Sequence, residues 1–166
     1  IKMKKMKGME NCMCVYERLK ELGITLPKAP TPMGIYYPAK EFGEKFIYIS
    51  GQGPNVDGKP ILTGKLGRDL TLEQGQKAAY VCMLNVLGVL HEKIGDLNKV
   101  KSAVKVLGFV ACADDFYDHP KVINAGSQLL VDVFGEEIGK AARSAIGTNA
   151  LPGNIPVEIE ALFEIE

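Results

Sequence analysis

Alternation of apolar and polar residues marks the segments that are expected to be strands. Residues 45–53 and 99–112 alternate and are rich in β-branched and aromatic side chains, which is typical of strands. Two further strands are expected over 143–148 and 156–165. Residues 55–64, with an Asp-Gly pair in their middle, predict a hairpin.

Helical periodicity predicts two long helices and a shorter one. The first long helix, over 72–94, follows a capping box in which Thr71 and Gln74 satisfy reciprocal backbone donors. The second, over 120–134, has a proline in its first turn, where a missing N–H is tolerated. A short amphipathic helix is expected over 15–22, before a proline-rich connector.

The order of these elements predicts an α+β fold, in which one sheet carries two long helices on one face. In the last strand, alternate residues from Val157 to Ile165 are apolar and would face the helices. Glu158 and Glu160 would face the other way.

That second face needs a cover, because the strands over 45–53 and 99–112 are apolar on both faces. Phe46 and Tyr48 alternate with Ile47 and Ile49, and Leu107 and Phe109 alternate with Val104, Val106 and Val110. Two long helices cover only one face of a sheet. We therefore expect a homo-oligomer to cover the other.

Length and charge favour one soluble domain. The 166 residues suit a single domain, and Lys plus Arg equals Asp plus Glu at 20 each. A formal net charge of zero gives no long-range field to attract nucleic acid. We expect residues 1–8 to be a non-native or disordered extension, 9–31 to hold the short helix and connector, and 32–166 to form the main domain.

No stretch fits a signal peptide or a membrane span, so we expect a cytoplasmic protein.

Metal and nucleotide sites are not expected. Cys12 and Cys14 could bind a soft metal, but no second Cys pair follows and both histidines lie far away in sequence. Common phosphate-binding and nucleophile-elbow motifs do not occur. His91 and His119 are expected at helix ends, and Arg68 is expected to be a surface charge.

Arg143 differs from the other cations because small and apolar residues surround it in sequence. A partly buried guanidinium requires an anionic partner. One candidate is a structural carboxylate, Glu158 or Glu160, on a neighbouring strand. The other is the carboxylate of a substrate, which the planar fork of arginine binds in a bidentate manner. These residues alone favour neither alternative.

The stretch that follows Arg143, "RSAIGTNALPGNIPVEIEALFEIE", resembles the C-terminal signature of the Rid family of reactive intermediate deaminases, also called the YjgF family. That signature is Arg-Ser-x-Val, then Leu-Pro, then a strand with Glu-Ile-Glu. Three further stretches match the family in order: "PMGIYYP", "YISGQGP" and "DFYDHPKVINAGSQLLVDVF". The resemblance covers residues 32–166.

The resemblance implies a chorismate-mutase-like fold and a homotrimer whose sheets pack into a central barrel with clefts between subunits. It also implies cofactor-free hydrolysis of enamines and imines, such as 2-imino acids, to 2-keto acids and ammonia. By position, Arg143 would bind the substrate carboxylate and Glu158 would position the attacking water. Ser50, Tyr36 and Asn124 would line the cleft.

One residue departs from the family pattern. Many deaminating members have a cysteine two residues after the arginine, where this chain has Ala145. Three functions are therefore weighed: an imine or enamine deaminase, a non-catalytic trimer that binds a small carboxylate, and an endoribonuclease. The neutral net charge and the lack of a basic-aromatic pattern make the third the weakest.

Overall fold

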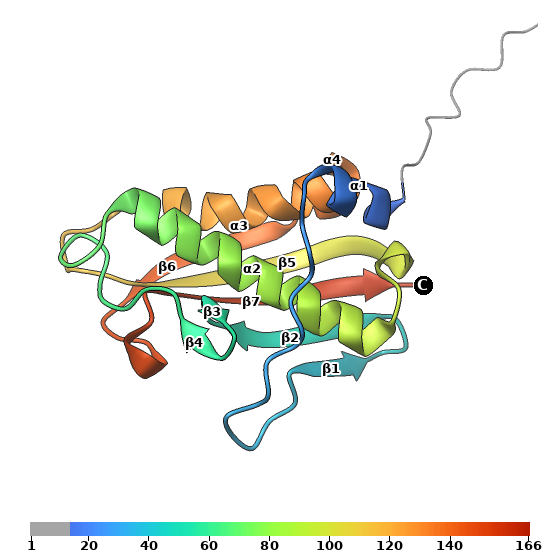
Figure 1. Ribbon diagram of the computed structural model, residues 1–166, viewed down its shortest axis with the longest axis horizontal. Helices are drawn as coiled ribbons and strands as arrows, with labels where there is room; N and C mark the ends of the chain where they lie inside the picture. Colours follow the sequence, from blue (N-terminus) through green and yellow to red (C-terminus); the bar gives the residue numbers. More distant parts are fainter. Residues whose placement is uncertain (1–13) are drawn as a thin grey trace, which may run out of the picture.

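A five-stranded sheet with two long helices on one of its faces makes up most of the protein (Figure 1). The computed structural model describes residues 14–166, so the expected extension over 1–8 and the Cys12 thiol lie outside the described residues. The helices are α1 (Val15–Glu21), α2 (Leu72–Ile94), α3 (His119–Phe134) and α4 (Glu136–Gly139). The strands are β1 (Ala39–Phe42), β2 (Phe46–Gln52), β3 (Asn55–Val56), β4 (Lys59–Pro60), β5 (Val100–Ala111), β6 (Ala142–Thr148) and β7 (Val157–Ile165).

The main sheet has the strand order β1-β2-β7-β5-β6, and β3 and β4 form a separate hairpin. β6 runs parallel to β5, whereas the other neighbouring strands of the main sheet are antiparallel. Strands β1 and β6 are therefore the two edges. This arrangement confirms the expected α+β fold with its helices on one face. Within residues 14–166, no helix is both long and apolar enough to cross a membrane.

The sequence pattern does not predict strand β1 or the short helix α4. The four residues of β1 are exposed or only partly buried, so no apolar alternation marks them. The sequence signal for this hairpin lies instead in the turn that joins β1 to β2. The three residues Gly43, Glu44 and Lys45 join Phe42 to Phe46, and Gly43 and Glu44 have φ values of 59° and 66°, a left-handed conformation that glycine adopts readily.

Helices α2 and α3 cover the face of the sheet that holds the core. The residues that point to them include Ile47, Ile49, Val106, Ile159 and Phe163, each at most 1% exposed. Gly108 of β5 allows α3 to approach the sheet closely. A Cβ at Gly108 would lie 2.5 Å from the end of the Ile123 side chain, so a larger residue there would push α3 outward.

The opposite face of the sheet has no cover among the described residues, and we call it the open face. Its apolar side chains are exposed or partly buried: Phe46, Tyr48, Leu107, Phe109, Ile146 and Leu162. Two hydrogen bonds between side chains of neighbouring strands also lie on the open face. The Tyr48 hydroxyl donates to Glu160 Oε1 at 2.5 Å, and Lys105 Nζ donates to Ser144 Oγ at 2.8 Å.

The expected position of Val104 beside Val106 on the buried face is wrong. The register of β5 against β7 shifts between Ala103 and Lys105, which inserts one extra residue into β5 as a bulge. Ala103 is therefore buried, whereas Val104 is only partly buried.

The connector between α1 and β1 crosses α2 (Figure 1). Gly88, in the middle of α2, makes the close approach possible, because a Cβ there would lie 2.4 Å from the carbonyl oxygen of Pro27. The connector ends in a loop with exposed apolar side chains, among them Met33 and Ile35.

Candidate functional site

Arg143 lies on the edge strand β6 and points to the face of the sheet that the helices cover. Its Cα pairs with that of Val106, which is buried in the core, and residues paired across strands share a face. The guanidinium reaches α3, where Nη1 donates to Asn124 Oδ1 at 2.7 Å and to Ser127 Oγ at 3.2 Å. Strand and helix together therefore fix the position of this cation.

The helix presents both acceptors because they are three residues apart. Asn124 and Ser127 lie on neighbouring positions of one face of α3. The adjacent Ile123 and Gly126 are buried against the sheet, which holds this face at the sheet edge. Asn124 was expected at the site from the sequence and Ser127 was not, although its spacing of three residues from Asn124 is a signal for it.

Arg143 has no carboxylate partner in the part of the chain that the structure describes. No ion pair within residues 14–166 includes it, and both oxygens that it contacts are neutral. The structural alternative, a pair with Glu158 or Glu160, is therefore wrong within one chain. β6 pairs with β5 and not with β7, so neither glutamate lies on a strand next to Arg143.

Glu158 lies on the open face of the sheet. Its Cα pairs with that of Phe109, whose side chain faces opposite to that of Val106. The carboxylate lies over Gly51, where a Cβ would overlap it. The register of β2 against β7 shifts between Ile49 and Gln52, and this bulge places the Gly51 backbone beneath the carboxylate.

Burial raises the pKa of the Glu158 carboxyl, and the negative charge of Glu160 raises it further. In the single chain, the charged neighbour of Glu158 is therefore another carboxylate and not a cation. A hydrogen bond to Glu160 in turn raises the pKa of the Tyr48 hydroxyl, which stays protonated as a donor.

Ser50 lies in β2, the strand next to that of Glu158, and Tyr36 lies in the loop before β1. Ser50 precedes Gly51 in β2, and its hydroxyl donates to the Tyr37 carbonyl oxygen at 2.7 Å. This bond ties the loop that carries Tyr36 to β2. The Tyr36 side chain is half exposed.

The five predicted residues therefore form two groups in one chain. Arg143 and Asn124 lie at the β6 edge on the helix-covered face, and we call them, with Ser127, the arginine group. Glu158 lies in β7, Ser50 lies in β2 and Tyr36 lies in the loop that Ser50 holds, and we call them, with Gly51, the glutamate group. Strand β5 separates the two groups.

A cavity of about 360 Å³ lies next to Arg143, between α3 and the start of β6. Val106, Leu130 and Val131 supply apolar lining. Lys140 also lines the cavity, but its ammonium pairs with Glu136 at 2.8 Å. The cavity therefore joins an apolar wall to one cation that has no carboxylate partner.

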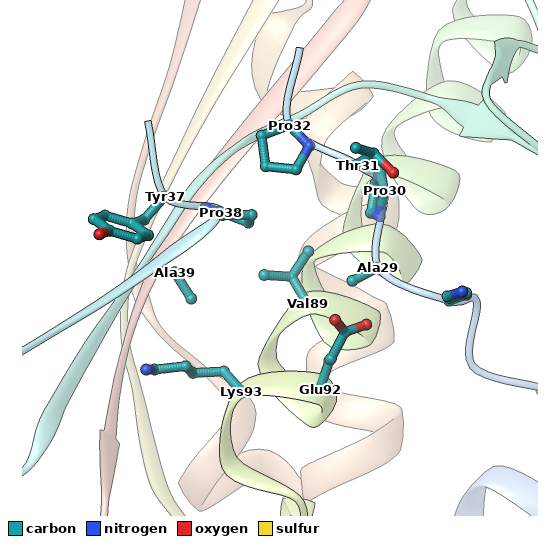
Figure 2. Close-up of a pocket in the computed structure, with 11 residues that line it drawn as sticks. Ala29, Pro30, Thr31, Pro32, Tyr37, Pro38, Ala39, Val89, Glu92 and Lys93 are labelled. Carbon is teal, nitrogen blue, oxygen red and sulfur yellow. The ribbon is translucent and has the colours of Figure 1, made fainter. Parts of the chain in front are cut away.

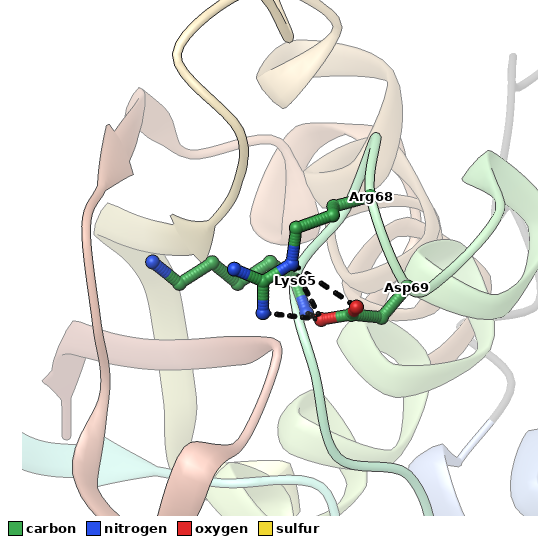
Figure 3. A network of polar contacts seen from close by, with 3 residues as sticks. All are labelled: Lys65, Arg68 and Asp69. Atoms are coloured by element: carbon green, nitrogen blue, oxygen red, sulfur yellow. Dashed lines mark hydrogen bonds and ion pairs between the residues drawn. The ribbon is translucent and has the colours of Figure 1, made fainter.

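Two other features carry none of the predicted residues. A pocket of about 390 Å³ lies between the connector, β1 and α2, with Val89 between Pro38 and Ala29 (Figure 2). Arg68, expected to be a surface charge, forms an exposed ion pair with Asp69 at 2.8 Å, and Asp69 also accepts from the Lys65 backbone (Figure 3).

Comparisons with known proteins agree with the fold and with the order of the motifs. Residues 16–163 match a family model described as "YjgF/chorismate mutase-like, putative endoribonuclease". The chain is 40% identical over 151 residues to protein TCP17 of Trypanosoma cruzi, a match that covers 91% of this chain and 94% of that protein. It is 31% identical over 144 residues to a 2-iminobutanoate/2-iminopropanoate deaminase of Dermatophagoides farinae, covering 86% and 95%. The crystal structure of protein Atu1372 of Agrobacterium tumefaciens, of unknown function, has a TM-score of 0.84 and 41% identity, with 92% of each chain covered.

Proposed function

The chain belongs to the YjgF/chorismate mutase-like family, and from this membership and the arginine group we propose that it hydrolyses 2-imino acids and their enamine forms. The products are 2-keto acids and ammonia, and the reaction uses no cofactor. A relative with 31% identity is a 2-iminobutanoate/2-iminopropanoate deaminase, which supports this reaction class.

The observation that carries the proposal is the state of Arg143. The guanidinium is partly buried and held by two neutral oxygens, without a carboxylate partner among residues 14–166. Leaving a buried cation unpaired costs free energy. A substrate carboxylate would remove this cost and would accept two parallel hydrogen bonds from the guanidinium.

The arginine group and the glutamate group complete one site only if they come from different subunits. We propose a homotrimer whose open faces pack into a central barrel. In it, the β6 edge of one subunit meets the glutamate group of the next. The apolar open face supports this assembly, because a face with exposed Tyr48 and Ile146 needs a cover.

The reaction needs a held substrate and a held water more than a strong nucleophile. Arg143 binds the carboxylate, which fixes the imine carbon, and Glu158 accepts a proton from the water that attacks it. A C–O bond forms, and the electrons of the C=N bond move to nitrogen. Glu158 returns its proton to nitrogen, which gives a carbinolamine. It then transfers the hydroxyl proton to the amine, so that the carbonyl forms as the C–N bond breaks and ammonia leaves.

The raised pKa of Glu158 supports this proton-transfer role. A carboxyl group whose pKa lies closer to the working pH transfers protons in both directions more readily than an ordinary surface glutamate. The cavity beside Arg143 supports a substrate with an apolar side chain, since Leu130 and Val131 line it.

Turnover of imino acids tests the proposal. An amino-acid oxidase generates the imine, and semicarbazide competition or keto-acid release reports its hydrolysis. We expect Arg143→Ala to lose at least about 100-fold in kcat/KM, since a bidentate carboxylate contact contributes about 3 kcal/mol. Arg68→Ala removes an exposed arginine that is already paired and is the matched control. A full rate in Arg143→Ala would contradict the proposal.

A second function, binding of a small carboxylate without turnover, is favoured by Ala145, because many deaminating relatives have a cysteine there. A thermal shift with pyruvate, lost in Arg143→Ala, together with no hydrolysis of any imine tested, would select it. Salt-dependent binding of RNA would instead support the endoribonuclease alternative.

A further inference from the structure

Cys112 and His119 meet at the end of the sheet, away from both groups described above. Cys112 follows β5, and His119 is the first residue of α3. The Cys112 sulfur lies 3.3 Å from His119 Nε2. The Phe116 ring packs edge-on against the imidazole with the ring centres 5.6 Å apart. The contact therefore places a thiol next to an imidazole nitrogen, which can act as a base.

Gly147 of β6 provides the space that this pair occupies. A Cβ at Gly147 would lie 2.5 Å from His119 Nε2 and 3.0 Å from the Cys112 sulfur. The Cys112 N–H donates to the Thr148 carbonyl oxygen at 3.2 Å, which fixes the thiol beside the glycine. In the single chain, Gly147 lies exposed on the edge strand, so the pair opens to the outside there.

The opening is a cavity of about 260 Å³, lined by both members of the pair. Phe116 and Tyr117 give it aromatic walls, and Asp114 is its one acidic residue. This lining favours a small, planar and uncharged compound and disfavours an anion. The pair has no third partner for a metal: within residues 14–166 no three His, Cys, Asp or Glu side chains form such a group.

The thiol needs a base in order to react. Burial raises the pKa of the Cys112 thiol, and the charge of Asp114 raises it further, whereas a backbone hydrogen bond with Thr148 and the charge of Lys65 act in the opposite direction. The thiol is therefore protonated at neutral pH, and only its thiolate is a strong nucleophile. A neighbouring imidazole can take the proton as the sulfur attacks.

We propose that Cys112 and His119 form a reactive thiol–imidazole pair that adds covalently to small, uncharged α,β-unsaturated carbonyl compounds. His119 Nε2 takes the thiol proton while the sulfur bonds to the β-carbon. The electrons of the C=C bond move to the α-carbon, which then takes the proton back from His119. A thioether forms, nothing leaves, and no oxidant is needed.

This site is separate from the proposed deaminase site. Arg143 and Gly147 are four residues apart on β6, which is roughly 13 Å along a strand. The adduct chemistry uses neither Arg143 nor Glu158. Deaminase turnover and thiol addition can therefore fail independently.

N-ethylmaleimide, which is planar, uncharged and conjugated, tests the proposal on the full chain. Peptide mass spectrometry gives a separate rate for each cysteine at pH 7. We expect Cys112 to react at least about tenfold faster than Cys82, which is fully buried. We expect His119→Gln to slow Cys112 about tenfold or more and to leave Cys14 unchanged. Cys112→Ser must remove the label from that peptide.

A second variant separates loss of the base from loss of the fold. Gly147→Ala keeps His119 but places a methyl group against Nε2, which must push the ring off the sulfur. It should also slow Cys112, with a thermal midpoint close to that of the native chain. Two outcomes would overturn the proposal. One is a Cys112 rate as slow as that of Cys82, and the other is an unchanged Cys112 rate in folded His119→Gln and Gly147→Ala.

The charge of the reagent tests the proposed class of ligand. Iodoacetamide and iodoacetate have similar size, and only the second is an anion. Cys112 should prefer iodoacetamide over iodoacetate more strongly than Cys14 does, because Asp114 lines its cavity. An equal preference at the two cysteines would overturn the assignment to uncharged compounds.

Discussion

Arg143 and Glu158 lie on opposite faces of the same sheet, with strand β5 between their strands. Arg143 shares its face with Val106 and the helices, whereas Glu158 shares the open face with Phe109. No change of side-chain conformation carries both groups to one point within a chain. If the two act on one substrate, two subunits must supply them.

A charge on the open face should therefore abolish both assembly and turnover. Leu107→Glu places a carboxylate at the centre of that face, where a partly buried leucine lies. We expect a monomer by light scattering, a near-native circular dichroism spectrum and no measurable deaminase activity. Lys20→Glu changes an exposed residue of α1 and should leave the oligomer intact. An active monomer of Leu107→Glu would exclude a site shared between subunits.

An internal carboxylate at position 124 should compete with the substrate for Arg143. Asn124→Asp keeps the shape of the side chain that accepts from Nη1 at 2.7 Å, but it adds a negative charge. We expect the KM for 2-imino acids, or the Kd for pyruvate, to rise at least about tenfold at pH 7. Ser127→Ala removes a neutral acceptor and should raise the same KM or Kd less, by about threefold to tenfold. Equal effects of the two variants would show that charge at Arg143 is not the determinant.

In the single chain, the raised pKa of Glu158 predicts a pH-dependent gain in stability for Glu158→Gln. Because its folded pKa is raised, native Glu158 favours the folded state below the ordinary carboxyl range, and this contribution is lost as pH rises through the folded pKa. The glutamine variant should match the native thermal midpoint at pH 4 and exceed it by about 2 °C at pH 7.5. Glu164→Gln, on the same face of β7, controls for a general charge effect. If the thermal midpoint of the native protein instead rose relative to that of the variant as the pH rises, the predicted direction would be wrong.

The same substitution should separate binding from chemistry. Glu158→Gln removes the proton acceptor but leaves the arginine group intact. We expect kcat to fall at least about 100-fold while the affinity for pyruvate changes less than about threefold. In the native protein, kcat/KM should fall as the pH drops and Glu158 becomes protonated.

Gly51→Ala should act through Glu158. A methyl group at position 51 overlaps the carboxylate, so the glutamate must move from its place over the β2 bulge. We expect kcat to fall about tenfold to 100-fold with little change in the thermal midpoint. The double-mutant cycle with Glu158→Gln provides the check: Gly51→Ala should have almost no further effect when the carboxylate is absent. If the losses of kcat from the two substitutions add, Gly51→Ala acts through something other than the Glu158 carboxylate.

Local sequence signals predicted most of the elements, because each signal acts within a few residues. The capping box of Thr71 and Gln74 marks the start of α2 in the structure as it does in the sequence. The Asp57–Gly58 turn of the small hairpin is also confirmed. Strand β1 escaped prediction because it buries too little for alternation to mark it. The displacement of Val104 depends on a bulge whose partner lies on β7, far away in the sequence.

The site was predicted as a set of residues, but its geometry was not. The pairing of β6 with β5 brings together segments more than 30 residues apart, and no local pattern near Arg143 specifies it. The sequence therefore left Glu158 as a candidate neighbour of Arg143, which the strand order excludes within one chain. The contact of Arg143 with α3 follows from the same long-range packing, which also brings Ser127 to the guanidinium.

Gly88 indicates which residues unfold together with helix α2. A glycine inside a helix costs about 1 kcal/mol relative to alanine, and here it admits the Pro27 carbonyl against α2. The connector thus rests on a surface of α2 that is shaped to receive it. We expect a chain shortened to residues 32–166 to lose that contact while it keeps the helix-weakening glycine. In the full chain, residues 14–31 should therefore unfold together with α2 in a single transition, in keeping with a family match that already begins at residue 16.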